Sequence, residues 1–242
     1  MKEAEAIIRT HVIERWSRYR ARQFFDAFCQ SLLDAGISND DIGKKLDELL
    51  EDEVTSEIVF DAYRAVCLTK SKSLGPRIIA LLTAELVIAK SSADSSDQLI
   101  FAAAEELTDS ELNEFSEFAL SHTVKLQSGK DKDVKLNGGA LEIRWCDHSL
   151  SSNGKIPVGP LDLARDIGSW ASKLKRIGLI SDDVTERQWH YKEDSERHIS
   201  EPGVARVITH WLFLTDESQV LATLIRRAGT GTGTSHVAAH ST

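Results

Sequence analysis

The sequence predicts a mainly α protein, with an N-terminal helical bundle followed by a smaller α+β domain. Up to about Leu120, apolar residues recur every three or four positions, as they do along amphipathic helices. Beyond Ser121 they alternate with polar residues and turn signals appear, as in short strands. The chain has 242 residues, 41% of them hydrophobic, so both parts are long enough to bury a core. We therefore expect an acidic helical domain over 1–122, an α+β domain over 123–228 and a disordered Gly/Thr-rich tail over 229–242.

The helical domain is predicted to hold about six helices. The first extends from Glu3 to a stop at Gly36, with its apolar residues at helical spacing. Asn39 is expected to cap a short helix through Leu50, and Ser56 to begin the next helix.

The most apolar run of the chain, "IIALLTAELVIA", predicts a central core helix. Pro76 stands just before it, where the first turn of a helix tolerates proline. The run contains Glu85 and is about a dozen residues long, against the roughly 20 that cross a bilayer, so no membrane partner is expected. Two further helices follow the Ser-rich link "KSSADSSD", and a capping box from Thr108 to Glu111 opens the second of them.

The second domain is predicted to be winged-helix-like, with strands on both sides of a helix. The stretch "TVKLQSGKDKDVKLNGGALEIRW" indicates two or three short strands, which belong either to this domain or to a separate element, and a Ser/Asn/Gly loop follows to Gly159. After a helix, "VTERQWHYK" and "VARVITHWLFL" are expected to pair as strands. Thr215 is expected to cap a last helix, "TDESQVLATLIRR".

The stretch "LARDIGSWASKLKRIGLI" has the small-residue spacing of a helix-turn-helix. Gly168 and Gly178 are only ten positions apart, however, and a helix between them is too short to lie in a major groove and still reach a wing. We therefore expect one continuous helix over 161–177 with an apolar core face. Its last turn carries the residues that would bind nucleic acid in the alternative interpretation, Lys173, Lys175 and Arg176.

Charge divides unevenly along the chain. Residues 1–120 hold 13 Lys and Arg against 23 Asp and Glu, a net −10, whereas residues 121–242 hold 16 against 15, a net +1. Such an acidic first half repels nucleic acid and attracts basic proteins. The segment "EELTDSELNEFSEF" is either a solvated helix face or an acidic protein-binding surface, whose candidate residues are Glu106, Asp109, Glu114 and Glu117.

A basic stripe lies on the first predicted helix, where Arg15, Arg18 and Arg22 recur at helical spacing beside Tyr19. Such a stripe either clamps nucleic acid or pairs with acidic groups of the same domain. In a domain of this acidity, the sequence favours internal pairing.

The signatures of phosphate-binding loops, nucleophile elbows and zinc sites do not occur in the sequence, so we expect no catalytic residues, no cofactor and no metal. The tetrapeptide "WCDH" contains the parts of a thiol site, but neighbouring strand residues point to opposite faces, so Cys146, Asp147 and His148 cannot all converge. The histidines near the predicted strand pair, His190, His198 and His210, form either a metal or pH-sensing group or separate solvated residues.

The N-terminus "MKEAEAIIRTHVIERW" mixes charged and apolar residues from the start, unlike a secretory signal. The three cysteines are an odd, widely spaced set, which argues against a disulfide framework. We therefore expect the protein in the cytoplasm.

The order of several segments resembles that of the bacterial Abi-alpha proteins. These are the apolar helix, "LIFAAAEELTDSELNEF", "KLKRIGLI", a wing-like strand pair and "LFLTDESQVLATLI", within residues 75–228. The chain departs from that layout by inserting strands at 123–145 and by its Gly/Thr tail. The resemblance implies a role in abortive infection or another interaction role, and it carries over no catalytic residue.

The expected function is therefore that of a non-enzymatic bacterial or prophage defence or immunity factor acting through protein–protein interaction. Its expected partner is a protein, for example a basic toxin or a phage component. The alternative is a DNA-binding transcriptional regulator that uses the second domain.

Overall fold

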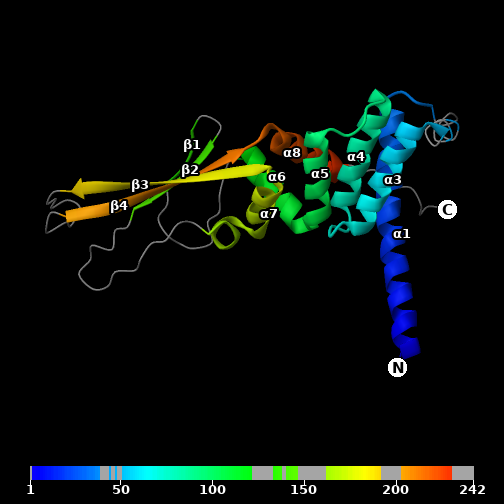
Figure 1. The fold of residues 1–242 in the computed structure, drawn as a ribbon, viewed down its shortest axis with the longest axis horizontal. Helices are drawn as coiled ribbons and strands as arrows, with labels where there is room; N and C mark the ends of the chain where they lie inside the picture. The colour runs from blue at the N-terminus through cyan, green and yellow to red at the C-terminus, as the bar shows by residue number, and fades with distance from the viewer. Residues whose placement is uncertain are drawn as a thin grey trace, which may run out of the picture. The chain divides into compact units, whose positions relative to one another are not determined.

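The computed structural model describes residues 2–38, 44, 47, 51–121, 133–137, 140–146, 162–191 and 203–230. This part of the chain is mainly helical with one antiparallel sheet, which confirms the predicted fold class (Figure 1). It divides into two compact units, a helical unit of residues 1–119 and 216–242, and a sheet unit of residues 120–215.

Helix α4 (Leu74–Ala89) is the centre of the helical unit. It packs against four other helices, namely α1 (Lys2–Asp34), α3 (Glu53–Leu68), α5 (Ser95–Glu106) and α8 (Asp216–Thr230). Most of the side chains along α4 are buried, and Ile78 and Ile79 are fully buried. The predicted core helix is therefore confirmed. Helix α6 (Asp109–Ser121) follows α5 along the chain.

Helix ends in this unit follow the local sequence signals. α1 ends before Gly36, whose φ of 91° is a left-handed conformation that glycine adopts without strain. The N–H of Ile37 then donates to the carbonyl of Leu32 at 3.1 Å, which closes the helix end. The capping box before α6 is present, since Thr108 N donates to Glu111 Oε2 at 2.9 Å and Glu111 N to Thr108 Oγ1 at 3.4 Å.

Helix α8 belongs to the helical unit, whereas the sequence placed it in the second domain, residues 123–228. Its buried face includes Leu221, Leu224 and Ile225, and it packs against α4 and α5. The guanidinium of Arg77 on α4 donates to the carbonyl of Ala228 at 3.0 Å. An amphipathic pattern shows that a helix has a core face, but it does not show which element will cover that face.

The sheet unit has strand order β1-β2-β4-β3, with every neighbouring pair antiparallel. Its strands are β1 (Asp133–Asn137), β2 (Ala140–Cys146), β3 (Ile180–Tyr191) and β4 (Gly203–Leu214). The expected pairing of β3 with β4 is confirmed, and β2 pairs with β4, so the strands near residues 133–146 belong to this unit.

The helical segment before β3 is broken, so the predicted continuous helix over 161–177 is wrong. A π-helical turn η1 (Leu163–Ile167) leads into Gly168, and α7 (Ser169–Ile177) begins after it. Gly168 has φ 150° and ψ 154°, a region open essentially to glycine alone. The Asp162 side chain caps η1 by accepting from Ala164 N and Arg165 N. The apolar spacing continues across Gly168, and for that reason the pattern suggested a single helix.

Several expectations lie outside the described residues: the cap at Asn39, most of the helix through Leu50, the loop up to Gly159, and tail residues 231–242. Gly229 and Thr230, predicted to begin the tail, are still helical in α8. Among the helices that the structure describes, none combines the length and the apolar character needed to cross a membrane.

Candidate functional site

Asp109, one of the four predicted protein-binding acids, is used inside the helical unit. Its carboxylate accepts hydrogen bonds from the Ser71 hydroxyl and from the N–H groups of Lys72, Ser73 and Leu74, the last at 2.8 Å. Burial alone would raise the pKa of Asp109, but these hydrogen bonds outweigh burial and hold the pKa below its ordinary value. The carboxylate therefore stabilises the loop that leads into α4.

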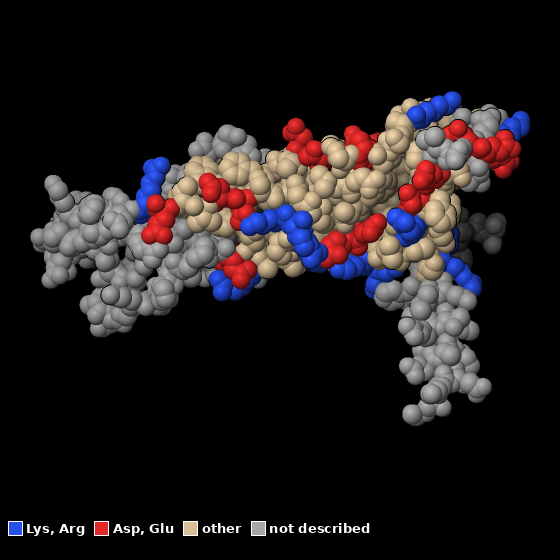
Figure 2. All heavy atoms as spheres, in the orientation of Figure 1, with Lys and Arg blue, Asp and Glu red and all other residues tan. Residues whose placement is uncertain are grey.

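The other three acids divide in the same way between internal and exposed positions. Glu106 is mostly covered and forms an ion pair with Lys70 at 2.8 Å. Glu114 and Glu117 are exposed on α6, and Glu114 accepts a hydrogen bond from Ser110 at 2.9 Å. On the face that Figure 2 shows, acidic and basic side chains of the described residues lie interspersed. Asp109, Glu106 and Glu114 are therefore each already bound by a group of this chain.

The predicted nucleic-acid-binding residues lie on α7, with Lys175 and Arg176 in its last turn and Lys173 before it. Lys175 and Arg176 are exposed and Lys173 is partly exposed. The Lys175 ammonium forms an ion pair with the Asp182 carboxylate on β3 at 2.5 Å. The charge of Lys175 is thus partly neutralised within the sheet unit.

Asp182 joins this lysine to a buried histidine on β4. His210 is 2% exposed, and its Nε2 lies 3.0 Å from Asp182 Oδ2. Burial lowers the pKa of His210 below its ordinary value, although the Asp182 carboxylate opposes this effect. Burial would raise the pKa of Asp182, but the hydrogen bonds from Lys175 and His210 lower it on balance. The geometry fits a neutral imidazole that donates to a charged carboxylate, and burial keeps this group away from any substrate.

Neither the histidine group nor the thiol site considered for "WCDH" is assembled in the described part of the chain. In the β3–β4 register His190 pairs with Val204 and His210 with Val184, which separates the two histidines by six positions, about 20 Å along the strands. Cys146 ends β2, while Asp147, His148 and His198 lie outside the described residues. Among the described residues, no three His, Cys, Asp or Glu side chains are placed to hold a metal ion.

Arg22 of the basic stripe on α1 shows the internal pairing that the sequence favours. Arg22 forms an ion pair with Asp26 at 3.6 Å, and Arg18 and Tyr19 are exposed. The side chain of Arg15 is outside the described part.

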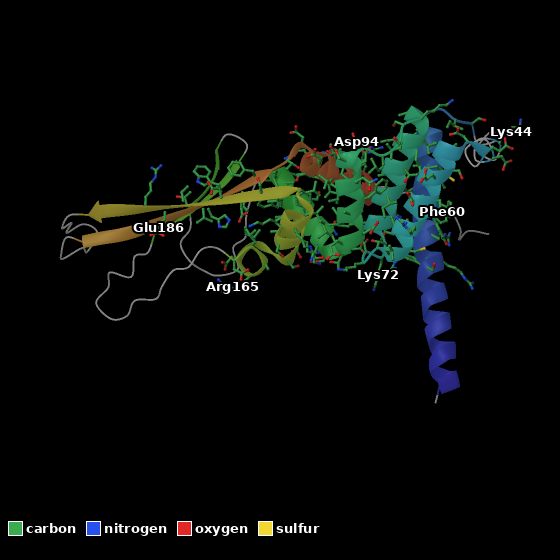
Figure 3. The ribbon with its side chains drawn as sticks, in the orientation of Figure 1. Lys44, Phe60, Lys72, Asp94, Arg165 and Glu186 are labelled. Carbon is green, nitrogen blue, oxygen red and sulfur yellow. The ribbon has the colours of Figure 1, made fainter. Side chains whose placement is uncertain are left out.

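An exposed aromatic surface on α1 and α3 is the clearest candidate for binding. We define it by Phe25, Phe60, Tyr63 and Leu68. Phe60, which Figure 3 labels, is 68% exposed, and Leu68 is 64% exposed. The rings of Phe25 and Tyr63 lie 6.5 Å apart, which joins the two helices. Exposed apolar side chains that adjoin one another are typical of interaction surfaces, and the rings of Phe25 and Tyr63 adjoin across the two helices.

The aromatic surface is held by the core beneath it. The Phe25 ring meets the fully buried Phe24 ring edge-on at 5.2 Å, and Phe24 stacks on Phe28 at 5.7 Å. A ring supported in this way loses little freedom when a partner covers it, which favours binding.

The sequence itself contains a signal for this surface. Ala62 and Val66, four positions apart on α3, form its core face and are buried. Phe60 and Tyr63 fall off that face by helical spacing, so two large aromatic residues were left where an ordinary solvated helix carries polar ones.

Comparison with protein-family models, with curated proteins and with solved structures found no match to this chain. Its candidate site therefore rests on the geometry of the described residues.

Proposed function

We propose that this chain is a non-enzymatic protein-binding factor of the bacterial or prophage defence and immunity type, acting in the cytoplasm. The observation that carries the proposal is the aromatic surface on α1 and α3. Aromatic residues are enriched at protein interfaces because each supplies a large apolar area at a small entropic cost.

Charge supports a basic partner. The first 120 residues carry a net −10, and a field of that sign speeds the approach of a positively charged protein. Glu114 and Glu117 on α6 remain candidate contacts for a basic partner. The aromatic surface would supply the central contacts, because rim charges contribute little affinity of their own.

The proposal is tested by comparing proteins recovered from bacterial lysate at moderate salt with the wild-type chain and with two variants. Phe60→Ser removes the most exposed aromatic side chain of this surface, and Val220→Ser is its matched control, since Val220 is an exposed apolar residue of α8. We expect a partner protein that the wild type and Val220→Ser recover and Phe60→Ser does not. The affinity of Phe60→Ser for the purified partner should be at least tenfold lower than that of the wild type. Equal recovery with both variants would contradict the assignment of this surface.

A DNA-binding regulator is the second candidate, and a specific observation favours it. Helix α7 leads directly into the antiparallel pair β3–β4, which is the order of a recognition helix and a wing. Against it, Lys175 is paired with Asp182. Duplex binding that weakens steeply with salt, and whose salt slope falls by about one unit with Lys173→Gln, would support this candidate over the first.

A further inference from the structure

Strand β3 forms one edge of the sheet in the sheet unit. Within the part of the chain that the structure describes, β3 pairs with β4 alone, at every position from Ile180 to Tyr191. An edge strand of this length presents a row of backbone N–H and C=O groups that can pair with another strand. The outer edge of β3 is therefore a candidate interaction surface.

Two hydrogen bonds show which residues of β3 point these backbone groups away from β4. The N–H of Thr215 donates to the carbonyl of Leu179 at 3.3 Å, and these two residues continue the β3–β4 register by one position. Hydrogen-bonded pairs alternate with non-hydrogen-bonded pairs in an antiparallel sheet, so the odd-numbered residues of β3 bond to β4 and the even-numbered residues point outward. The N–H of Val184 agrees with this assignment, since it donates to the Asp183 carboxylate at 2.9 Å.

Charged side chains stand along the middle of this edge, where Figure 3 labels Glu186. The exposed residues of the stretch 183–187 are Asp183, Val184, Glu186 and Arg187. Like charges directly opposite each other oppose the pairing of two strands, and charged edge strands commonly resist self-association for this reason. Whether the charges of β3 oppose or favour pairing with a second copy therefore depends on the register.

The hydrogen-bond pattern limits how two β3 strands can pair about a two-fold axis. Outward-pointing residues must face outward-pointing residues, so the axis passes through a residue of β3 and not between two residues. Axes through Asp183, Glu186 and Arg187 each set that residue opposite its own copy. An axis through Val184 sets Asp182 opposite Glu186. Each of these registers is destabilised by like charges.

The axis through Thr185 sets opposite charges together instead. Asp183 of each strand then lies opposite Arg187 of the other, with Cβ atoms about 4.5–5.5 Å apart. The Val184 N–H, which the Asp183 carboxylate accepts in the single chain, would donate to a carbonyl of the second strand. That exchange leaves the carboxylate to pair with the arginine opposite it.

We propose that two copies of this chain pair antiparallel along β3, about a two-fold axis at Thr185, so that their sheets join into one. A two-fold interface must be self-complementary, and the Asp183–Arg187 pair, formed twice, meets that requirement. Glu186 meets its own copy only on a diagonal, about 7–8 Å away, where repulsion is weaker. The aromatic surface belongs to the helical unit, so this proposal and the proposed function succeed or fail separately.

The first test is the mass of the full chain in solution, measured by light scattering over a range of concentrations. We expect a rise with concentration toward twice the 26.8 kDa of the chain. Val184→Pro removes an N–H that points away from β4, and edge strands tolerate proline at such positions. This variant should stay monomeric with the far-UV circular dichroism of the wild type. A wild-type chain that stays monomeric, or a folded Val184→Pro variant that still dimerises, would overturn the proposal.

A charge exchange tests the register and does not depend on the proline variant. Asp183→Arg and Arg187→Asp should each weaken dimerisation several-fold, because each sets like charges opposite each other twice. The double variant should restore dimerisation. The two positions are about 13 Å apart along one strand, so the restored pairing must come from the second copy.

Glu114→Arg is the matched control for the change of net charge, since Glu114 is an exposed carboxylate of α6 in the helical unit. It should leave the dimer unchanged. A double variant that dimerises no better than the single variants, or a control that weakens the dimer as much as Asp183→Arg, would overturn the register at Thr185.

Discussion

Gly75, the second residue of α4, offers the sharpest test of the packing described for the helical unit. A Cβ atom at Gly75 would lie 2.6 Å from the Ala104 carbonyl oxygen, 2.6 Å from Thr69 Oγ1 and 2.8 Å from Ser71 Cβ. Ordinary contacts begin near 3.4 Å, so Gly75→Ala forces α4 and the end of α5 apart. The same movement strains the buried hydrogen bond from Thr69 Oγ1 to the Ala104 carbonyl, which is 2.8 Å long.

The expected cost follows from three contributions. Overpacking costs about 1–3 kcal/mol and a disrupted buried hydrogen bond about 1–3 kcal/mol. The better helix propensity of alanine returns about 1 kcal/mol. We therefore expect Gly75→Ala to lower the free energy of unfolding by about 3 kcal/mol, or the Tm by roughly 6–12 °C in a unit of this size.

Urea unfolding followed by circular dichroism measures this change. The matched control is Gly229→Ala on α8, where an added Cβ meets nothing within 4 Å, so its stability should be unchanged or slightly raised. If Gly75→Ala unfolds within about 0.5 kcal/mol of the wild type, the close approach of α4 to α5 is incorrect.

Three further predictions concern buried groups. Asp109→Asn should cost about 1–3 kcal/mol, measured by urea unfolding at neutral pH, because three backbone N–H groups lose a charged acceptor. Since the folded pKa of Asp109 is lowered, this stabilisation should disappear as pH falls through that pKa, below about 4. A variant whose stability changes with acid pH as the wild type does would refute this prediction. The folded pKa of His210 is also lowered, so the wild type should lose stability as pH falls below about 6.5, the unfolded value, and level off beneath the folded value; His210→Gln should flatten that part of the profile. Leu174→Ala should lower the free energy of unfolding by about 2–5 kcal/mol because Leu174 is fully buried on α7. Lys175→Gln, which removes a partly exposed ion pair, should lower it by under about 1 kcal/mol. Similar costs for the two variants would show that α7 does not dock through Leu174.

Local signals in the sequence were sufficient for most of the secondary structure. The stop at Gly36, the capping box before α6, the core helix α4 and the β3–β4 pair all depend on residues close together in the chain, and the structure has each of them. The change from helical to strand spacing near Ser121 likewise coincides with the boundary between the two units, at Leu120. These features follow from backbone hydrogen bonding and side-chain spacing, which act over a few residues.

Only the tertiary structure decided which surfaces meet. The pattern of α8 predicted an apolar face but not its docking on α4 and α5, and the spacing across Gly168 concealed a break that depends on the backbone conformation of one residue. Asp109 looked like one of four equivalent surface acids until the loop before α4 brought three N–H groups to it from more than 30 residues away. The exposed fractions of Phe60 and Tyr63 depend in the same way on what packs beside α3. Composition and periodicity record what each segment must bury, whereas the partner that buries it is set by contacts between residues distant in the chain.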